Sequence, residues 1–371
     1  MYTVNLKIDD AKPGMTLASS VYHTTGGGSQ MLVARKDSIL TENTLRVLTS
    51  MKIETIDVVS RRAKPEVYTP VTSLFSEELR IAAIDNVREL FECFTLDGCR
   101  DKTVALRCVG TIDGVVGDLL TVVDDQNSGL IHINDLKPPD EYTLHHSLSV
   151  SVLAIATGRE LGMADDEIKR LGRCAMLHDI GKQLVPSNLL NKEGKLTVSE
   201  FEIVQKHPIW GADNLRKASL IDEDSIMSIL AHHEKENGSG YPYNLKGNEI
   251  PLFSKIISVA DVYDAITSFR SYRIPIQPID AFNIIFNDIG ESFDYDIVRA
   301  FYNRLEFFPV NTIVELSNNR IALVSHTGKL KLRPTVRIWG ADEFINLEAA
   351  KDIEIKRILK PNELPQGFKF F

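Results

Sequence analysis

The chain has little cysteine and no cysteine pair at metal-binding spacing. Its 371 residues contain four cysteines, Cys93, Cys99, Cys108 and Cys174, and none of them form a CxxC motif. This pattern excludes a cysteine-based zinc site, and four cysteines are too sparse for a disulfide-stapled scaffold. We therefore expect reduced and mostly buried thiols.

Long apolar runs and an excess of positive charge are also missing. No run of about 18 apolar residues is present, and residues 1–5 lack the basic and apolar regions of a signal peptide. The formal net charge of −9 disfavours nonspecific binding to a nucleic acid polymer or an anionic membrane. We predict a cytoplasmic protein without membrane insertion, in which any anionic ligand is bound by a local basic pocket.

The apolar patterns predict a mainly α protein in four parts. Residues 1–64 carry short alternating apolar runs, which indicate a small α+β module. Residues 65–136 have apolar residues at helical intervals and predict a helical connector. Residues 137–308 predict one all-helical domain, and residues 309–371 a β-rich appendage with turn signals between its runs.

Helix boundaries in the large domain follow from capping residues. Ser, Asp and Pro recur at the proposed starts, as helix caps and first turns require. The predicted helices span residues 142–161, 165–180, 199–206, 208–217, 222–233, 251–269, 278–290 and 293–304.

Histidine is concentrated in this domain, where six of the nine histidines lie between residues 145 and 233. His178 and Asp179 follow an apolar helical run, and burying an ionisable pair there is costly unless a metal or a partner charge compensates. The pair taken alone is also compatible with a purely structural role. Lys182 falls on the same helical face, where it would contact a phosphate or simply face solvent.

A second histidine run, His232-His233, precedes Glu234 and the Gly-rich loop that contains Tyr241. Adjacent helical residues diverge by about 100°, so the two histidines cannot bind one metal from the same face unless the helix end is distorted. Two neighbouring metals would accept both. His207 precedes a proline and is moved to a helix junction, where it is either a ligand or an exposed helix-end residue. Imidazole with few carboxylates favours iron, manganese or zinc over magnesium or calcium.

Charged pairs three residues apart complete the pattern. Asp261 and Asp264 interrupt an apolar helix; Asp261 is the better ligand candidate, and Asp264 is suited to orient an imidazole. Arg270 and Arg273 would clamp a phosphate, or serve as cations favoured at a helix C-terminus.

At the start of the helical domain, two adjacent histidines are both candidate ligands. Glu141 and His145 form an i, i+4 pair, and Tyr142 and His146 form another. Spacing does not choose between the two histidines.

Together these motifs resemble the HD-GYP domain, a branch of the HD phosphohydrolase superfamily associated with hydrolysis of the bacterial messenger cyclic di-GMP. The resemblance covers residues 140 to about 300 and implies a helical HD-type phosphohydrolase fold. The matching pieces are Tyr142-Thr143 with His146-Ser147, Leu177 to Lys182, His207-Pro208 with Gly211, His232-His233-Glu234, Gly238 with Gly240-Tyr241-Pro242, Ala260-Asp261 with Asp264-Ala265, and Arg270 with Tyr272-Arg273.

The resemblance also implies residue roles. Asp179 would bridge two divalent ions, iron or manganese, and Asp179 and Lys182 would be catalytic. His146 is preferred over His145 because the family's ligand precedes Ser. Some members hold a third metal through a glutamate four residues before that histidine, and Tyr142 occupies this position here, so we expect two metals unless Glu141 reaches round. The implied ligands are His146, His178, Asp179, His207, His232, His233 and Asp261, and the implied substrate contacts are Lys182, Tyr241, Arg270 and Arg273.

The function implied by the resemblance is metal-dependent hydrolysis of cyclic di-GMP to linear pGpG, with GMP as a further product left open. One alternative is a phosphohydrolase for another cyclic dinucleotide or nucleotide. Another is an HD domain that binds a nucleotide or a protein partner without catalysis. A homodimer, and a signalling partner bound through the N-terminal module, are further expectations.

Overall fold

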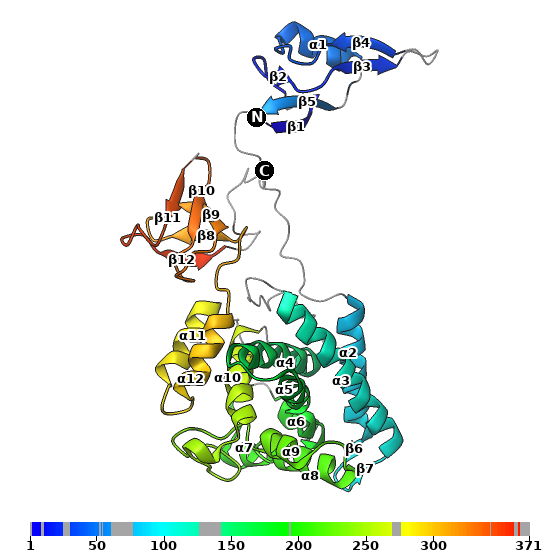
Figure 1. Ribbon diagram of the computed structural model, residues 1–371, viewed down its shortest axis with the longest axis vertical. Coiled ribbons are helices and arrows are strands. Elements are labelled where there is room, and N and C mark those ends of the chain that lie inside the picture. The colour runs from blue at the N-terminus through cyan, green and yellow to red at the C-terminus, as the bar shows by residue number, and fades with distance from the viewer. Residues whose placement is uncertain are drawn as a thin grey trace. The chain divides into compact units, whose positions relative to one another are not determined.

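The computed structural model describes residues 2–8, 11–24, 30–51, 53, 55–60, 77–125, 142–192, 194–268, 276–341, 343–359 and 363. These residues fall into two compact units, one holding the described residues up to 60 and the other those from 77 onward. The elements of both are labelled in Figure 1. Within the described residues, no helix combines the length and apolarity needed to cross a membrane.

The first unit has the α+β character that the sequence predicts. One sheet has the antiparallel order β1-β5-β2, and β3 pairs with β4. Helix α1 (Glu42–Ser50) begins after Thr41, whose side chain accepts the backbone N–H of Thr44 and so caps the helix. The strands are β1 (Tyr2–Lys7), β2 (Thr16–Leu17), β3 (Val21–Thr24), β4 (Gln30–Ala34) and β5 (Thr55–Ser60).

The second unit is mainly helical, which confirms the predicted fold class. Two short 3-10 helices, η2 (Ile180–Leu184) and η3 (Gly247–Glu249), lie between its α-helices. The α-helices are α2 (Glu77–Cys93), α3 (Lys102–Asp125), α4 (Tyr142–Glu160), α5 (Asp165–Leu177), α6 (Ser187–Leu190), α7 (Val198–Val204), α8 (His207–Ala218), α9 (Glu223–Leu230), α10 (Leu252–Thr267), α11 (Pro278–Asn287) and α12 (Tyr295–Arg304).

Helix α4 is the central helix of this unit. It packs against α2, α3, α5, α10 and α12, and Figure 1 shows it among them. Every residue from His145 to Gly158 is buried, because apolar residues such as Val150, Val152 and Leu153 cover successive faces of the helix. A titratable side chain on α4 is therefore forced into the interior.

Helices α2 and α3 belong to the same hydrophobic core as α4 and α5; Leu90 and Ile112 pack in one cluster with Leu153. A short hairpin, β6 (Phe94–Thr95) and β7 (Gly98–Cys99), separates α2 from α3. Its two-residue turn is Leu96-Asp97, and Gly98, the first residue of β7, has a positive φ of 136° that favours glycine. The predicted four-part division of the chain stays a prediction.

The C-terminal strands form one five-stranded antiparallel sheet in the order β11-β10-β9-β8-β12. The predicted β appendage rests on apolar runs at residues 313–316, 321–324 and 335–339. These runs coincide with β8 (Ile313–Leu316), β9 (Ile321–His326) and β10 (Thr335–Ile338). The two edge strands, β11 (Phe344–Asn346) and β12 (Ile355–Ile358), were not predicted. They are short and mostly exposed, so they lack the alternation that marks a half-buried strand.

Three predicted helices end three residues too late. The helix predicted for 278–290 ends at Asn287, and the other two lead into the candidate site. The helix predicted for 165–180 ends at Leu177 and is followed by η2, and the one predicted for 222–233 ends at Leu230. In both cases a histidine follows the last turn and its ring nitrogen contacts a carbonyl of that turn, at Ala175 and at Ile229. These helices stop where a side chain satisfies a carbonyl that a continuing helix would bond to a backbone N–H.

Candidate metal centre

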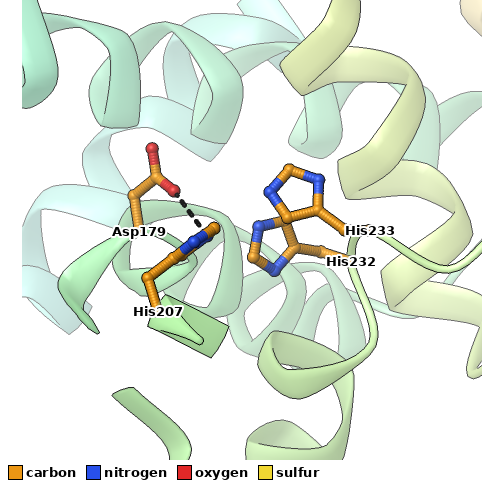
Figure 2. Close-up of side chains that lie close together, drawn as sticks. All are labelled: Asp179, His207, His232 and His233. Atoms are coloured by element: carbon orange, nitrogen blue, oxygen red, sulfur yellow. Dashed lines mark ion pairs between the residues drawn. The ribbon is translucent and has the colours of Figure 1, made fainter. Parts of the chain in front are cut away.

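All seven predicted ligands lie on elements that converge in the interior of the helical unit. Each group of candidate ligand atoms has its members within 4.8 Å of one another, and Asp179 belongs to two of the groups. Figure 2 shows the largest group, with both rings of the His232-His233 pair beside Asp179 and His207. The groups are Asp179 with His207, His232 and His233; His146 with His178 and Asp179; and His178 with His232 and Asp261.

Three of these histidines sit at helix ends and use the same local geometry. Helices α5, α7 and α9 end one to three residues before His178, His207 and His232. In each case Nδ1 contacts the carbonyl oxygen three residues earlier, one of the last-turn carbonyls that has no intrahelical partner. The distances are 2.7 Å from His178 to Ala175, 2.8 Å from His207 to Val204 and 2.6 Å from His232 to Ile229. A carbonyl only accepts, so Nδ1 carries the proton and the lone pair of Nε2 is free to bind a metal.

The atoms left over by this arrangement are buried and unsatisfied. His178 Nε2, His207 Nε2 and His232 Nε2 have no hydrogen-bond partner among the described residues, and neither does Asp179 Oδ1. Leaving a buried acceptor without a partner costs about 1–3 kcal/mol. Four such acceptors within one cluster of imidazoles and carboxylates are the donor set that a divalent transition metal takes. The cluster can hold a metal ion.

The protonation states of His207, His232 and Asp179 agree with that role. Burial lowers the pKa of His207, and burial together with His178 and His207 lowers the pKa of His232 to about 3. Burial alone would raise the pKa of Asp179, but the neighbouring His178 ring and the ammonium group of Lys182 hold it well below its ordinary value. At neutral pH the two imidazoles are therefore neutral and the carboxylate is ionised, which are the forms that bind metals.

His146 has a different partner from the helix-end histidines. Its Nδ1 lies 2.7 Å from Asp264 Oδ2, and its Nε2 lies 3.0 Å from Asp261 Oδ1 and 3.7 Å from Asp179 Oδ2. Burial would lower the pKa of His146, but the hydrogen bonds to Asp261 and Asp264 raise it to about 9. Asp264 is fully buried and fixes the orientation of this ring, as carboxylates do behind metal-binding histidines.

The early end of α9 changes how the adjacent histidines can act. His232 and His233 lie in the turn after the helix, with ring centroids 4.0 Å apart. The 100° divergence expected on a continuous helix therefore does not apply, and both rings lie in one group with Asp179 and His207. The prediction of a continuous helix through residue 233 did not allow for this arrangement.

Two further predicted residues lie at the edge of the cluster. Lys182 Nζ is 2.6 Å from Asp179 Oδ2, and its side chain remains 27% exposed. The Tyr241 ring lies 4.7 Å from the ring of His233, tilted by 30°. Both side chains can therefore reach a ligand that approaches the cluster from solvent.

Glu234 is a residue of this site to which sequence reasoning assigned no role. It is buried, and its two carboxylate oxygens accept the backbone N–H groups of Tyr243 at 2.7 Å and Leu245 at 3.0 Å. These bonds hold the loop that carries Tyr241. A carboxylate directly after two candidate ligands was the signal, since such a charge is rarely buried unless it is paired.

The remaining predicted residues are placed as follows. His145 is buried beside His146 but belongs to none of the ligand groups found among the described residues. Glu141, Arg270 and Arg273 lie outside the described residues.

Comparison with known proteins gives a consistent set of relatives. Residues 130–297 match the family model described as HD domain. A cyclic di-GMP phosphodiesterase of Pseudomonas aeruginosa is 37% identical over 213 residues, which are 57% of this chain and 51% of that protein. The cyclic di-GMP phosphodiesterase PdeB of Borreliella burgdorferi is 30% identical over 183 residues, 49% of this chain and 48% of that protein.

A third relative has a different substrate in its name. The 3'3'-cGAMP-specific phosphodiesterase 3 of Vibrio cholerae is 38% identical over 178 residues, which are 48% of this chain and 38% of that protein. The chain spans about half the length of the first two relatives and less of the third.

Proposed function

Because residues 130–297 belong to the HD domain family and carry the HD-GYP motifs, we propose that this chain is a metal-dependent phosphodiesterase that hydrolyses cyclic di-GMP to linear pGpG. Two of the relatives above are named for this activity. The observation that carries the proposal is the set of buried, unbonded acceptor atoms on His178, Asp179, His207 and His232.

We propose two divalent ions, iron or manganese, as the cofactors. The seven ligands would be those implied by the family resemblance, with the Asp179 carboxylate between the two ions. Membership of Asp179 in two ligand groups supports this sharing. The ions would supply a nucleophile near neutral pH and would neutralise charge on the phosphodiester.

The chain's own residues would bind and orient the substrate. Lys182 is held by Asp179 with part of its side chain exposed, so its ammonium group would offset the charge that develops on the phosphoryl oxygens. Tyr241 would close against the substrate at the rim of the cluster. Arg270 and Arg273 stay predicted phosphate contacts, and GMP stays a further product left open.

A cyclic GMP-AMP dinucleotide is the second candidate substrate, because the chain is as similar to a relative named for it as to the cyclic di-GMP enzymes. The turnover rates of both dinucleotides, and of a cyclic dinucleotide that contains uracil, rank the candidate substrates directly. A domain that binds without catalysis would bind one of them tightly and leave it intact.

A homodimer, a signalling partner for the N-terminal module and a cytoplasmic location stay predictions.

The test is anaerobic incubation of the Fe- or Mn-loaded protein with cyclic di-GMP, followed by chromatography of products and metal analysis of the same sample. We expect His178→Ala and Asp179→Asn to lower both metal content and turnover by at least about 100-fold, because the first removes a ligand and the second removes the negative charge of a carboxylate found in two ligand groups. His326→Ala is the matched control, since this exposed histidine lies on β9. Unchanged metal content in both ligand variants, or a loaded wild type that leaves all dinucleotides intact, contradicts the proposal.

A further inference from the structure

Phe201 is a large apolar side chain that the hydrophobic core does not use. It lies on α7 and is 46% exposed. Helix α7 contains no buried residue, and Phe201 is not among the described side chains that pack against the core of the helical unit. Single exposed apolar side chains are common and need no ligand to explain them, so the inference rests on where this ring lies relative to the metal centre.

The ring of Phe201 ends a row of aromatic rings that starts at the metal centre. The ring of His233 lies 4.7 Å from that of Tyr241 at 30°, and the ring of Tyr241 lies 6.4 Å from that of Phe201 at 78°. The first pair of rings is tilted by 30°. The second is edge-to-face, which is a favourable aromatic geometry. Phe201 is the outermost ring of the row and the most exposed.

Helix α7 is held in place although none of its residues is buried. Lys192 Nζ donates to both carboxylate oxygens of Glu200, at 2.7 and 2.6 Å. The same carboxylate accepts the backbone N–H of Thr197, whose side chain in turn caps the helix. Phe201 directly follows Glu200, so its backbone is fixed before any ligand arrives. A backbone that is held before binding reduces the entropy lost when a ligand stacks on the ring.

We infer that Phe201 is a stacking platform for a nucleobase of the substrate. The inference rests on the proposed phosphodiesterase function, which puts a phosphodiester at the metal centre. In a cyclic dinucleotide each base lies one ribose away from a phosphodiester, and Phe201 lies one ring beyond Tyr241. A phenyl ring offers a π-face and no hydrogen-bonding group, so it binds purines more strongly than the smaller pyrimidines and does not distinguish guanine from adenine.

The test compares Phe201→Ala and Phe201→Trp on two substrates with the metal-loaded full chain. Cyclic di-GMP carries bases; methyl p-nitrophenyl phosphate is a diester without any. We expect Phe201→Ala to raise KM for cyclic di-GMP by about 5- to 150-fold, the range for loss of one base–aromatic stack, and to leave turnover of the small diester within about twofold. Phe201→Trp should retain wild-type KM. Val198→Ala, on the exposed side of the same helix, is the control and should change neither.

Equal losses on both substrates would show that Phe201 supports the fold of the site, and unchanged KM would show that no base stacks there; either result overturns the inference. If the wild type cleaves no dinucleotide, the proposed function fails, and calorimetry of cyclic di-GMP binding then decides about Phe201 separately. Binding that weakens about 5- to 150-fold in Phe201→Ala supports the platform by the same stacking estimate. Equal binding by wild type and variant, or none by either, overturns it.

Discussion

A histidine binds a metal through a nitrogen that carries no proton, so the partner of its other nitrogen decides which atom is available. At His178, His207 and His232 that partner is a last-turn carbonyl of the preceding helix. At His146 it is the carboxylate of Asp264. A carboxylate partner adds negative charge behind the ring and raises its basicity, which a carbonyl does to a smaller extent. His146 is thus the ligand whose strength depends most on one neighbouring residue.

At this scale we predict that Asp264→Asn weakens metal binding by about 10- to 100-fold while the protein remains folded. Asparagine can still accept the Nδ1 hydrogen bond through its oxygen, but it supplies no charge. Competition with a chromophoric chelator measures the apparent affinity. Asp118→Asn, at an exposed position of α3, should leave it unchanged, and an Asp264→Asn protein with wild-type affinity would contradict the assigned role.

At the scale of elements, the site depends on how closely η2 approaches α8. These two elements pack against each other, and each contributes a glycine to the contact. A Cβ at Gly181 would overlap the backbone carbonyl of His207, and a Cβ at Gly211 would press on the backbone of Gly181. This close approach brings His207 Nε2 to 3.3 Å from Asp179 Oδ1. Both positions therefore require glycine, because a side chain at either one would push the two elements apart.

We predict that Gly181→Ala destabilises the protein by about 1–3 kcal/mol, as overpacking does, and lowers metal content because α8 must move away from Asp179. Urea unfolding and metal analysis measure the two effects. Gly110→Ala is the matched control, since a Cβ there meets nothing within 4 Å; in the interior of α3 it should stabilise by about 0.5–1 kcal/mol. A Gly181→Ala protein as stable as the wild type would refute the close-packing argument.

At the scale of the whole molecule, Lys331 joins the C-terminal strands to the end of the helical domain. Its Nζ donates to the carbonyl oxygens of Asn303 at 2.5 Å and Leu305 at 3.0 Å, just after α12. Burial lowers the pKa of Lys331 to about 8, and the nearby Glu306 only partly opposes this. The charged form is thus penalised in the folded protein relative to the unfolded chain, whose lysines titrate near pH 10.5.

The sign of the pH effect follows from this difference. Between about pH 8 and 10.5 the unfolded chain binds more protons than the folded protein, so the penalty fades and stability rises with pH. We predict that the wild type gains stability relative to Lys331→Met, which does not titrate, as pH is raised from 7 to 10. Urea unfolding of both proteins at the two pH values measures the change. A stability difference that is constant or falls with pH would contradict it.

The helical class and the order of the elements could be predicted from local patterns, because apolar periodicity and capping residues act within a few residues of chain. Helix α4, with its apolar residues on every face, and the strands β8 to β10 were found in this way. The ends of α5 and α9 were missed because carbonyls of their last turns contact histidine side chains. Helix propensity takes no account of a side chain that replaces a backbone N–H as the partner of a carbonyl. Edge strands β11 and β12 were missed because they bury too little to show a pattern.

The sequence by itself determined which residue types the centre can use: the histidines, the Asp261 and Asp264 spacing, and the motif order that resembles the HD-GYP domain. Only the tertiary structure decided which of them meet. His145 and His146 differ by about 100° around the same helix, and the packing of α4 against α5 and α10 brings His146 to Asp261 and Asp264. The tertiary structure also decided which residues lie next to Glu234 and Phe201. Their neighbours are set by a loop and a short helix that fold against the centre, and contacts of that kind are fixed by packing in three dimensions and not by spacing along the chain.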